Sequence, residues 1–207
     1  MSGSNNEIST AHSDPIVTPA TGKTGSAWNR IARRIRVPLG FAFAAFYIWR
    51  ARPNWMSLSL GTGVALLGIA IRALASGQVK KNRELTTTGP YAYVRNPLYL
   101  GSVVIGMGFA VAARDIWIDV VLLAFFLLVY VPVIRSEQNF LNGCFPEYIH
   151  YRQRVPSLLP RTLKFAGLTR GFSRELYLRH REYNSLLGAA AMLAVLIAKI
   201  LWMPATR

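Results

Sequence analysis

Five stretches of the chain are almost entirely apolar, and polar or charged segments separate them. They are residues 37–49, 56–75, 98–113, 116–134 and 186–202. A helix needs about 20 apolar residues to cross a bilayer, with a range of about 17–25. The first stretch is shorter than that and must either borrow its flanks or lie partly in the membrane interface. The pattern predicts an all-α, polytopic integral membrane protein with about five transmembrane helices.

The third and fourth apolar stretches are separated only by Arg114 and Asp115. Two helices joined by so short a link form a tight antiparallel hairpin. The segment before this hairpin, residues 76–97, and the segment from Arg135 onward should therefore meet at the same end of the helix pair. The sequence thus predicts one site assembled from two separate blocks.

The remaining segments suggest three regions. Residues 1–26 are rich in Ser, Thr, Gly and Asn without an apolar run, which predicts a disordered N-terminal tail and no signal peptide. Residues 27–164 are the expected membrane core. Residues 165–207 are expected to hold an amphipathic segment, which could lie on a membrane surface, followed by a C-terminal transmembrane helix.

The charge of the chain fits a membrane protein better than a nucleic-acid binder. Among 207 residues, 52% are hydrophobic, and 24 Lys and Arg against 9 Asp and Glu give a net charge of +15. Most basic residues fall in segments that share one side if the N-terminus is inside, so the N-terminus and both blocks are expected to be cytoplasmic. This predicts a multi-pass protein of the inner membrane in a bacterium, or of the endoplasmic reticulum in a eukaryote. The bilayer is the expected partner, and nucleic acid is not.

A few single residues narrow the chemistry. Arg72 and Lys199 lie near the ends of apolar stretches and are expected to snorkel to the membrane surface. Cys144 is the sole cysteine, so no internal disulfide can form. His150 and His180 lack companions at metal-ligand spacing, and no bound metal is expected.

Two blocks carry candidate binding residues. The first, LTTTGPYAYVRNPLYLG at 85–101, is broken by Gly89 and Pro90 and supplies hydroxyls, aromatic faces and one fixed charge, as a ligand-binding loop would. The second spans residues 135–160, with Glu137 at the inner end of the fourth apolar stretch. A carboxylate there needs a cationic partner, either a ligand ammonium or a structural ion pair with Arg95 or Arg135.

Together the blocks resemble the membrane methyltransferases that include isoprenylcysteine carboxyl methyltransferase and the phospholipid methyltransferases. The first match is G-P-Y-x-Y-V-R-N-P-x-Y-x-G over 89–101. The second is an acid at Glu137 followed by x-x-x-L-x-x-x-F, and the third is E-Y-x-x-Y-x-x-x-V-P-x-x-x-P over 147–160. About 75 residues, 85–160, carry this resemblance.

The resemblance implies S-adenosyl-L-methionine as cofactor, bound at the cytoplasmic end of the hairpin. The positions that it implicates in cofactor binding are Leu85, Thr86, Tyr91, Asn96, Pro97, Leu98, Tyr99 and Glu137. Carboxylates suit the cofactor's amino group, and aromatic faces suit its sulfonium. The implied acceptor is lipophilic, such as a prenylated carboxylate or a phospholipid amine, with Arg135 as the candidate substrate-binding residue. No catalytic residue is assigned.

This chain departs from the family pattern at three positions. Asn96 stands where His is frequent, Gln138 where a second acid commonly follows the first, and Val133 where the isoprenylcysteine enzymes place an Arg. Two alternatives to methyl transfer stay open. One is a nicotinamide-dependent membrane reductase of the sterol-reductase type, and the other is a non-enzymatic membrane scaffold with an interfacial belt of Tyr and Arg.

Overall fold

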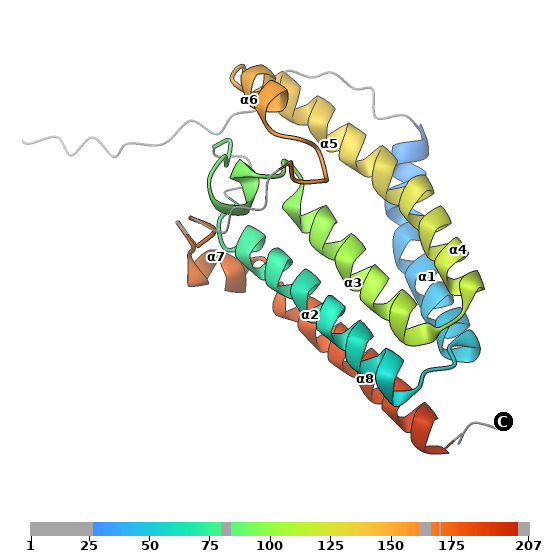
Figure 1. Cartoon of the computed structure of the whole chain (residues 1–207). Helices are drawn as coiled ribbons and strands as arrows, with labels where there is room; N and C mark the ends of the chain where they lie inside the picture. The colour runs from blue at the N-terminus through green and yellow to red at the C-terminus, as the bar shows by residue number, and fades with distance from the viewer. Residues whose placement is uncertain (1–26, 80–83, 162–166, 170, 203–207) are drawn as a thin grey trace, which may run out of the picture.

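The computed structural model describes residues 27–79, 84–161, 167–169 and 171–202, and every regular element within these ranges is helical (Figure 1). The long helices are α1 (Ala27–Arg50), α2 (Trp55–Ser76), α3 (Pro97–Ala113), α4 (Ile116–Phe125), α5 (Val131–Cys144) and α8 (Tyr183–Trp202). Short elements are the 3-10 turn η1 (Gly89–Ala92), the π-helical turn η2 (Phe126–Tyr130), α6 (Tyr148–Arg154) and α7 (Arg174–Arg179). The predicted all-α class is confirmed. The predicted tail, residues 1–26, lies outside the described residues.

Three described helices are long and apolar enough to cross a membrane. They are Trp55–Ser76, the continuous 29-residue helix Ile116–Cys144 that joins α4, η2 and α5, and Tyr183–Trp202. Helix α3 is apolar but has only 17 residues. The predicted membrane character is thus supported for three helices, and the count of five spans stays a prediction.

The predicted helix hairpin is confirmed, and its turn is built from Arg114 and Asp115. Arg114 takes a left-handed conformation with φ 53°, which reverses the chain after α3. The Asp115 carboxylate then caps α4 by accepting a hydrogen bond from the Trp117 amide at 3.0 Å. The same carboxylate pairs with Arg50 at 2.7 Å and so fixes the end of α1 to this turn. We call this end of the bundle the hairpin end.

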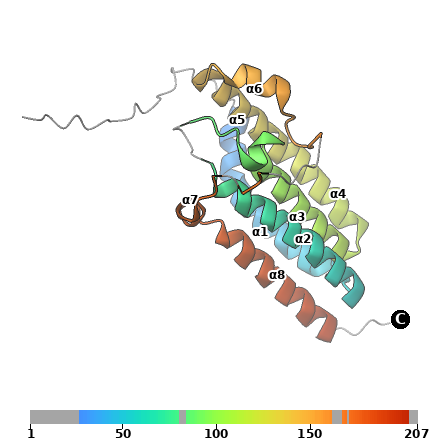
Figure 2. The ribbon, with the colours of Figure 1, turned by 60° about the vertical axis from the view of Figure 1, so that its left-hand side comes forward.

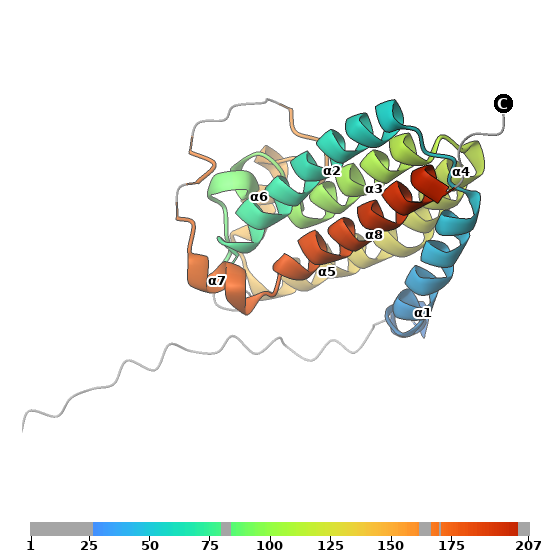
Figure 3. The ribbon, with the colours of Figure 1, turned by 90° about the horizontal axis from the view of Figure 1, so that it is seen from below.

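The opposite end of the bundle, which we call the motif end, carries η1, α6 and α7 (Figure 1). Helix α2 ends there and α3 begins there, so the two motif blocks reach the same end of the molecule. Figures 2 and 3 show α8 running beside α2, back toward the hairpin end.

Helices α2 and α3 pack closely because small residues face each other. A methyl group added to Gly68 would lie 2.7 Å from the Gly101 carbonyl oxygen, and one added to Gly108 would lie 2.6 Å from the Gly61 carbonyl oxygen. No side chain fits at these distances, so the two backbones touch directly. Gly61 and Gly68 of the second apolar stretch thus allow the close approach of α3. At Gly63 no atom lies within 4 Å of such a methyl group.

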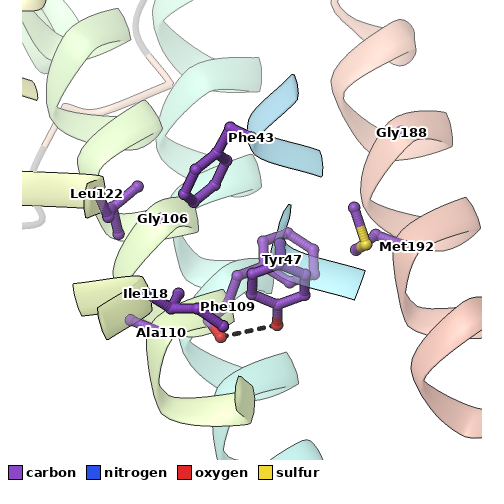
Figure 4. A pocket seen from close by; sticks show the side chains of 9 residues that line it. All are labelled: Phe43, Tyr47, Gly106, Phe109, Ala110, Ile118, Leu122, Gly188 and Met192. Atoms are coloured by element: carbon purple, nitrogen blue, oxygen red, sulfur yellow. Dashed lines mark hydrogen bonds between the residues drawn. The ribbon is translucent and has the colours of Figure 1, made fainter. Parts of the chain in front are cut away.

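The hydrophobic core lies near the hairpin end, where aliphatic residues of α2, α3, α4 and α8 surround Tyr47 of α1. Tyr47 is 2% exposed, and its hydroxyl donates a hydrogen bond to the Phe109 carbonyl oxygen at 2.8 Å (Figure 4). The rings of Tyr47 and Phe109 meet edge to face with centroids 6.0 Å apart. A small cavity of about 150 Å³ remains beside them, and Met192 of α8 closes it. Lys199 of α8 donates to the Ile48 and Trp49 carbonyls at the end of α1, so its amine caps a helix and does not simply extend outward.

Candidate functional site

The first motif block folds as a tight turn that leads into α3. Gly89 has φ +58°, a conformation that favours glycine, and the buried side chain of Gln78 packs directly against its Cα. The 3-10 turn η1 follows, with the Tyr91 amide donating to the Thr88 carbonyl at 3.1 Å. Pro97 then starts α3, where a missing amide hydrogen costs nothing. The glycine and the two prolines of this block therefore fix the path of the loop.

The second block lies directly on the first, as predicted. The Arg95 and Asn96 amides donate to the Pro156 and Ser157 carbonyls at 2.9 and 3.2 Å. The Asn96 side-chain amide adds bonds of 2.8 and 3.0 Å to the carbonyl and hydroxyl oxygens of Ser157. Residues about 60 positions apart are thus joined by a short ladder of hydrogen bonds. The two blocks form one site.

Helix α6 closes this site from the side of the second block. The Tyr151 hydroxyl donates to the Tyr91 carbonyl at 2.6 Å, and Tyr148, which is 1% exposed, receives a hydrogen bond from Arg95 at 3.1 Å. Burial raises the pKa of the Tyr151 hydroxyl well above its usual value. Tyr151 therefore stays neutral and acts through its ring and its hydroxyl hydrogen, whereas Tyr148 supplies a buried ring and an acceptor oxygen.

Tyr91 lies at the centre of the site. Its side chain is 8% exposed, and burial raises the pKa of its hydroxyl far above the usual value, with the charge of Glu137 as the next cause. Tyr151, Glu182 and Tyr99 raise the pKa further. The carboxylates of Glu137, in α5, and Glu182, just before α8, thus both act on this one buried hydroxyl.

The predicted cofactor-binding residues all lie at the motif end, but in different environments. Tyr91, Asn96 and Pro97 are buried, Leu85, Thr86, Leu98 and Tyr99 are half-buried, and Glu137 is exposed. The Tyr99 ring meets the Tyr130 ring edge to face at 5.8 Å, which joins α3 to η2. Within the described ranges no ion pair engages Glu137, and its predicted role in cofactor binding stays a prediction.

Arg135 and Glu137 occupy different faces of α5. They are two residues apart, which separates their side chains by about 200° around a helix with 3.6 residues per turn. Both side chains are exposed. Arg135 is therefore placed to contact a ligand along a different path from Glu137, and its predicted role in substrate binding stays a prediction.

A π-helical turn and an apolar cavity adjoin the site. Pro132 has no amide hydrogen, and in an α-helix its ring would meet the carbonyl of Leu128, so the preceding residues widen into η2, where the Val131 amide donates to the Phe126 carbonyl. This turn directs Tyr130 toward a cavity of about 540 Å³. Its other lining residues, mostly apolar and drawn from α1, α3, α4 and η2, include Phe43, Ser102, Gly106, Met107, Asp119, Leu122 and Phe126.

The contacts of several residues at the site were not predicted from the sequence. The Ser157 carbonyl oxygen accepts a hydrogen bond from the Asn96 side-chain amide, and its hydroxyl oxygen accepts one from the Gln138 side-chain amide at 2.7 Å. Arg72 was expected to snorkel to the membrane surface, but the structure corrects this. Its guanidinium pairs with Glu182 at 2.8 Å and donates to the Leu98 carbonyl at 3.3 Å, because these acceptors lie within reach of the end of α2. The presence of a charge inside an apolar stretch was the signal that could have found it.

Metal ligands do not gather in the described part of the chain. Within those ranges no group of three or more His, Cys, Asp or Glu side chains is placed to hold a metal ion. The prediction that no metal is bound is not tested by this observation.

Comparison with known proteins agrees with the resemblance to the membrane methyltransferases. Residues 55–148 match the model of the phospholipid methyltransferase family, which confirms the family resemblance predicted from the two blocks. This segment runs from the start of α2 to the first residue of α6 and includes all eight predicted cofactor-binding residues.

Two curated relatives are similar to the chain. The cobalt-zinc-cadmium resistance protein CzcN of Cupriavidus metallidurans is 32% identical over 142 residues, covering 64% of each chain. The nickel-cobalt-cadmium resistance protein NccN of Alcaligenes xylosoxydans xylosoxydans is 36% identical over 120 residues, covering 54% of this chain and 55% of the relative. The chain thus spans less than two thirds of the length of either relative. No solved structure matches it.

Proposed function

We propose that this protein is a membrane methyltransferase that uses S-adenosyl-L-methionine to methylate a lipophilic acceptor. The observation that carries the proposal is the hydrogen-bonded union of the two motif blocks. Asn96 and Arg95 of the first bind Ser157 and Pro156 of the second, and the charge of Glu137 raises the pKa of the Tyr91 hydroxyl. The family match over residues 55–148 supports the same reading.

The side chains at the motif end suit the cofactor. Glu137 offers an exposed carboxylate that no described cation engages, and this group can accept charge-assisted hydrogen bonds from an ammonium. The half-buried ring of Tyr99 offers an aromatic face for a cationic sulfur. When bound, the cofactor supplies an activated methyl group. The task of the protein is then alignment of acceptor and donor, which alone can supply much of the rate enhancement.

The apolar cavity supports a lipophilic acceptor. Its lining belongs to helices that are expected to lie in the bilayer, and Tyr130, which borders it, contacts Tyr99 of the motif. We infer that the apolar part of the acceptor occupies this cavity and that its reacting group reaches the motif end near Tyr99. A carboxylate, an amine and a thiol acceptor all fit this arrangement, with Arg135 as the candidate contact for a carboxylate.

The distribution of charge supports a cytoplasmic site. Of the described basic residues, the hairpin end holds Arg50, Arg52, Arg114 and Lys199, whereas the motif end holds Arg72, Arg95, Arg135, Arg152, Arg154, Arg161, Arg174, Arg179 and Arg181. Positive residues of short loops remain on the cytoplasmic side during insertion. The motif end is accordingly assigned to the cytoplasm.

Calorimetric titration of the detergent-purified protein with S-adenosylhomocysteine tests the proposal. The wild type should bind saturably, Glu137→Ala should lose this binding, and Glu147→Ala, an exposed carboxylate at the start of α6, should retain it. Absence of binding by folded wild-type protein would contradict the proposal. Binding of reduced nicotinamide dinucleotide phosphate in its place would favour the reductase alternative, and binding of neither would favour the scaffold.

A further inference from the structure

The segment that follows the family-matched region folds back onto the motif end. Five residues of this segment contact α2 or the two residues after it, and we call them the C-terminal clamp: Leu168, Phe172, Ser173, His180 and Glu182. None of them belongs to the stretch that matches the family, which ends at residue 148. Their contacts fall into two groups, one at each end of the first motif block.

The first group reaches Gly89, where the block begins its turn. The Gln78 side chain is 4% exposed and donates through its amide nitrogen to the Leu168 carbonyl at 2.6 Å. The same side chain packs against Gly89. Beside it, the Ser173 amide donates to the Gly77 carbonyl at 2.7 Å, and the Phe172 ring covers Gly77 so closely that no side chain would fit there. The clamp therefore fixes Gln78, and Gln78 in turn fixes Gly89.

The second group reaches Leu98, where the block enters α3. Glu182 accepts two hydrogen bonds from Arg72, at 2.8 Å and 3.1 Å. The third nitrogen of the same guanidinium donates to the Leu98 carbonyl at 3.3 Å and to the Ser102 hydroxyl. All three nitrogens of Arg72 are thus engaged, and its planar fork links the clamp to the first turn of α3.

We propose that the C-terminal clamp positions the cofactor loop, with Arg72 and Glu182 as positioning residues for cofactor binding. The clamp holds both ends of the loop from Gly89 to Leu98, and that loop contains Tyr91 and Asn96. The inference rests on the proposed function. It also gives the C-terminal helix α8, which begins immediately after Glu182, a role in the site as the anchor of this residue.

The geometry explains why loss of the Arg72–Glu182 ion pair should weaken cofactor binding and not only lower the stability of the fold. The Arg72 and Glu182 side chains are 21% and 14% exposed, so removal of the carboxylate leaves a guanidinium largely without solvent. The unpaired group would turn toward water and release the Leu98 carbonyl. A loop held only at Gly89 samples more conformations, and a ligand must then bear the cost of ordering it.

A second ion pair provides a matched control. Arg50 and Asp115 pair at 2.7 Å at the hairpin end, with side chains 28% and 8% exposed, a burial close to that of Arg72 and Glu182. Asp115→Asn removes the charge but keeps a side chain that caps a helix well. It therefore removes an ion pair of similar kind from the end of the molecule that lies away from the motifs.

The experiment compares Glu182→Gln with Asp115→Asn by two measurements on the full-length protein in detergent. Because residues in one network couple strongly, Glu182→Gln should raise the dissociation constant for S-adenosylhomocysteine about tenfold, and Asp115→Asn should leave it within about twofold. Hydrogen exchange of the ligand-free protein should show faster exchange at residues 91–98 in Glu182→Gln but not in Asp115→Asn. Glu182→Asp, which keeps the charge, should recover part of the affinity.

The outcomes separate this inference from the proposed function. Unchanged affinity and unchanged exchange in Glu182→Gln would overturn the clamp, as would equal effects in both variants. If the wild type does not bind S-adenosylhomocysteine, the proposed function fails, and the exchange measurement still decides whether the clamp holds the loop. If Glu182→Gln does not fold, Arg72→Lys takes its place, because a lysine keeps the charge but cannot bridge Glu182 and Leu98.

Discussion

The contact between α2 and α3 sets the position of Arg72 relative to the cofactor loop, and two glycines of α2 allow it to be tested. Gly68 faces α3, and a methyl group there would lie 2.7 Å from both the Gly101 carbonyl oxygen and the Ile105 amide nitrogen. Gly63 lies on the same helix and has no atom within 4 Å of such a methyl group. The substitutions Gly68→Ala and Gly63→Ala make the same chemical change and differ only in the atoms that surround the added methyl group.

The expected magnitude follows from two opposing effects. Alanine is favoured over glycine inside a helix by about 1 kcal/mol, and this term applies equally to both variants. At Gly68 the two nearest atoms belong to backbone, so they cannot rotate away, and overpacking of this kind costs about 1–3 kcal/mol. Gly63→Ala should therefore be neutral or slightly stabilising. The two variants should differ by about 1–3 kcal/mol in free energy of unfolding, because the helix propensity cancels.

Unfolding in mixed micelles, followed by circular dichroism as a denaturing detergent is added, measures this difference. Gly68→Ala should unfold at a lower fraction of denaturing detergent than the wild type, and Gly63→Ala at the same or a higher fraction. Equal stability of the two variants would refute the direct backbone contact between α2 and α3. It would also remove the structural basis for placing Arg72 against Leu98.

Three further predictions follow from single contacts. Asn96→Ala removes two hydrogen bonds to Ser157 and should lower the free energy of unfolding by about 1–3 kcal/mol in chemical or thermal denaturation, whereas Asn139→Ala, an exposed amide of α5, should change it by less than about 0.5 kcal/mol. Because burial raises the pKa of Tyr91 in the folded protein, the folded state keeps this proton after the unfolded chain has lost it. Stability should therefore fall as the pH rises above about 10, and the fall should be shallower in Tyr91→Phe when unfolding is measured across that range. Cys144, the sole cysteine, lies at the motif end and should react with a membrane-impermeant maleimide only from the cytoplasmic side of vesicles, while Arg114→Cys in a Cys144→Ser background should react only from the opposite side; labelling of both from one side would contradict the assigned orientation.

The pattern of the sequence predicted those parts of the structure that depend on local chemistry. Apolar stretches bounded by polar residues predicted the long helices, and the two-residue link at Arg114 and Asp115 predicted the hairpin turn. The hairpin in turn predicted that the blocks before and after it would meet, because antiparallel neighbours bring such segments to one end. These steps need only element length and connection length, which are read directly from the chain.

Contacts between distant side chains could not be predicted in the same way. Glu182 lies 110 positions after Arg72, and no spacing or motif relates the two residues. Their pairing depends on how α8 packs beside α2, which in turn depends on shape complementarity along both helices. The prediction for Arg72 used only a local rule, by which a charged side chain near a helix end lies at the membrane surface. The local rule failed because a carboxylate within reach offered a closer partner than water.

Two departures from the family pattern are linked in the structure by one residue. Asn96 and Gln138, read separately, are the positions where His and a second acid are commonly found, yet both side-chain amides donate to the Ser157 hydroxyl oxygen, at 3.0 and 2.7 Å. A hydroxyl oxygen has two acceptor sites, and the two amide donors fill both of them. An acid at 138 would instead have to accept from this hydroxyl, and the serine proton would then point toward α5. Because neither Asn nor Gln titrates, the bond that joins the two blocks keeps its donors and acceptors at every pH where the protein is folded. The link between the blocks therefore fixes their relative position and takes up no proton. In the proposed reaction, any proton that the methyl acceptor releases has to leave through another group.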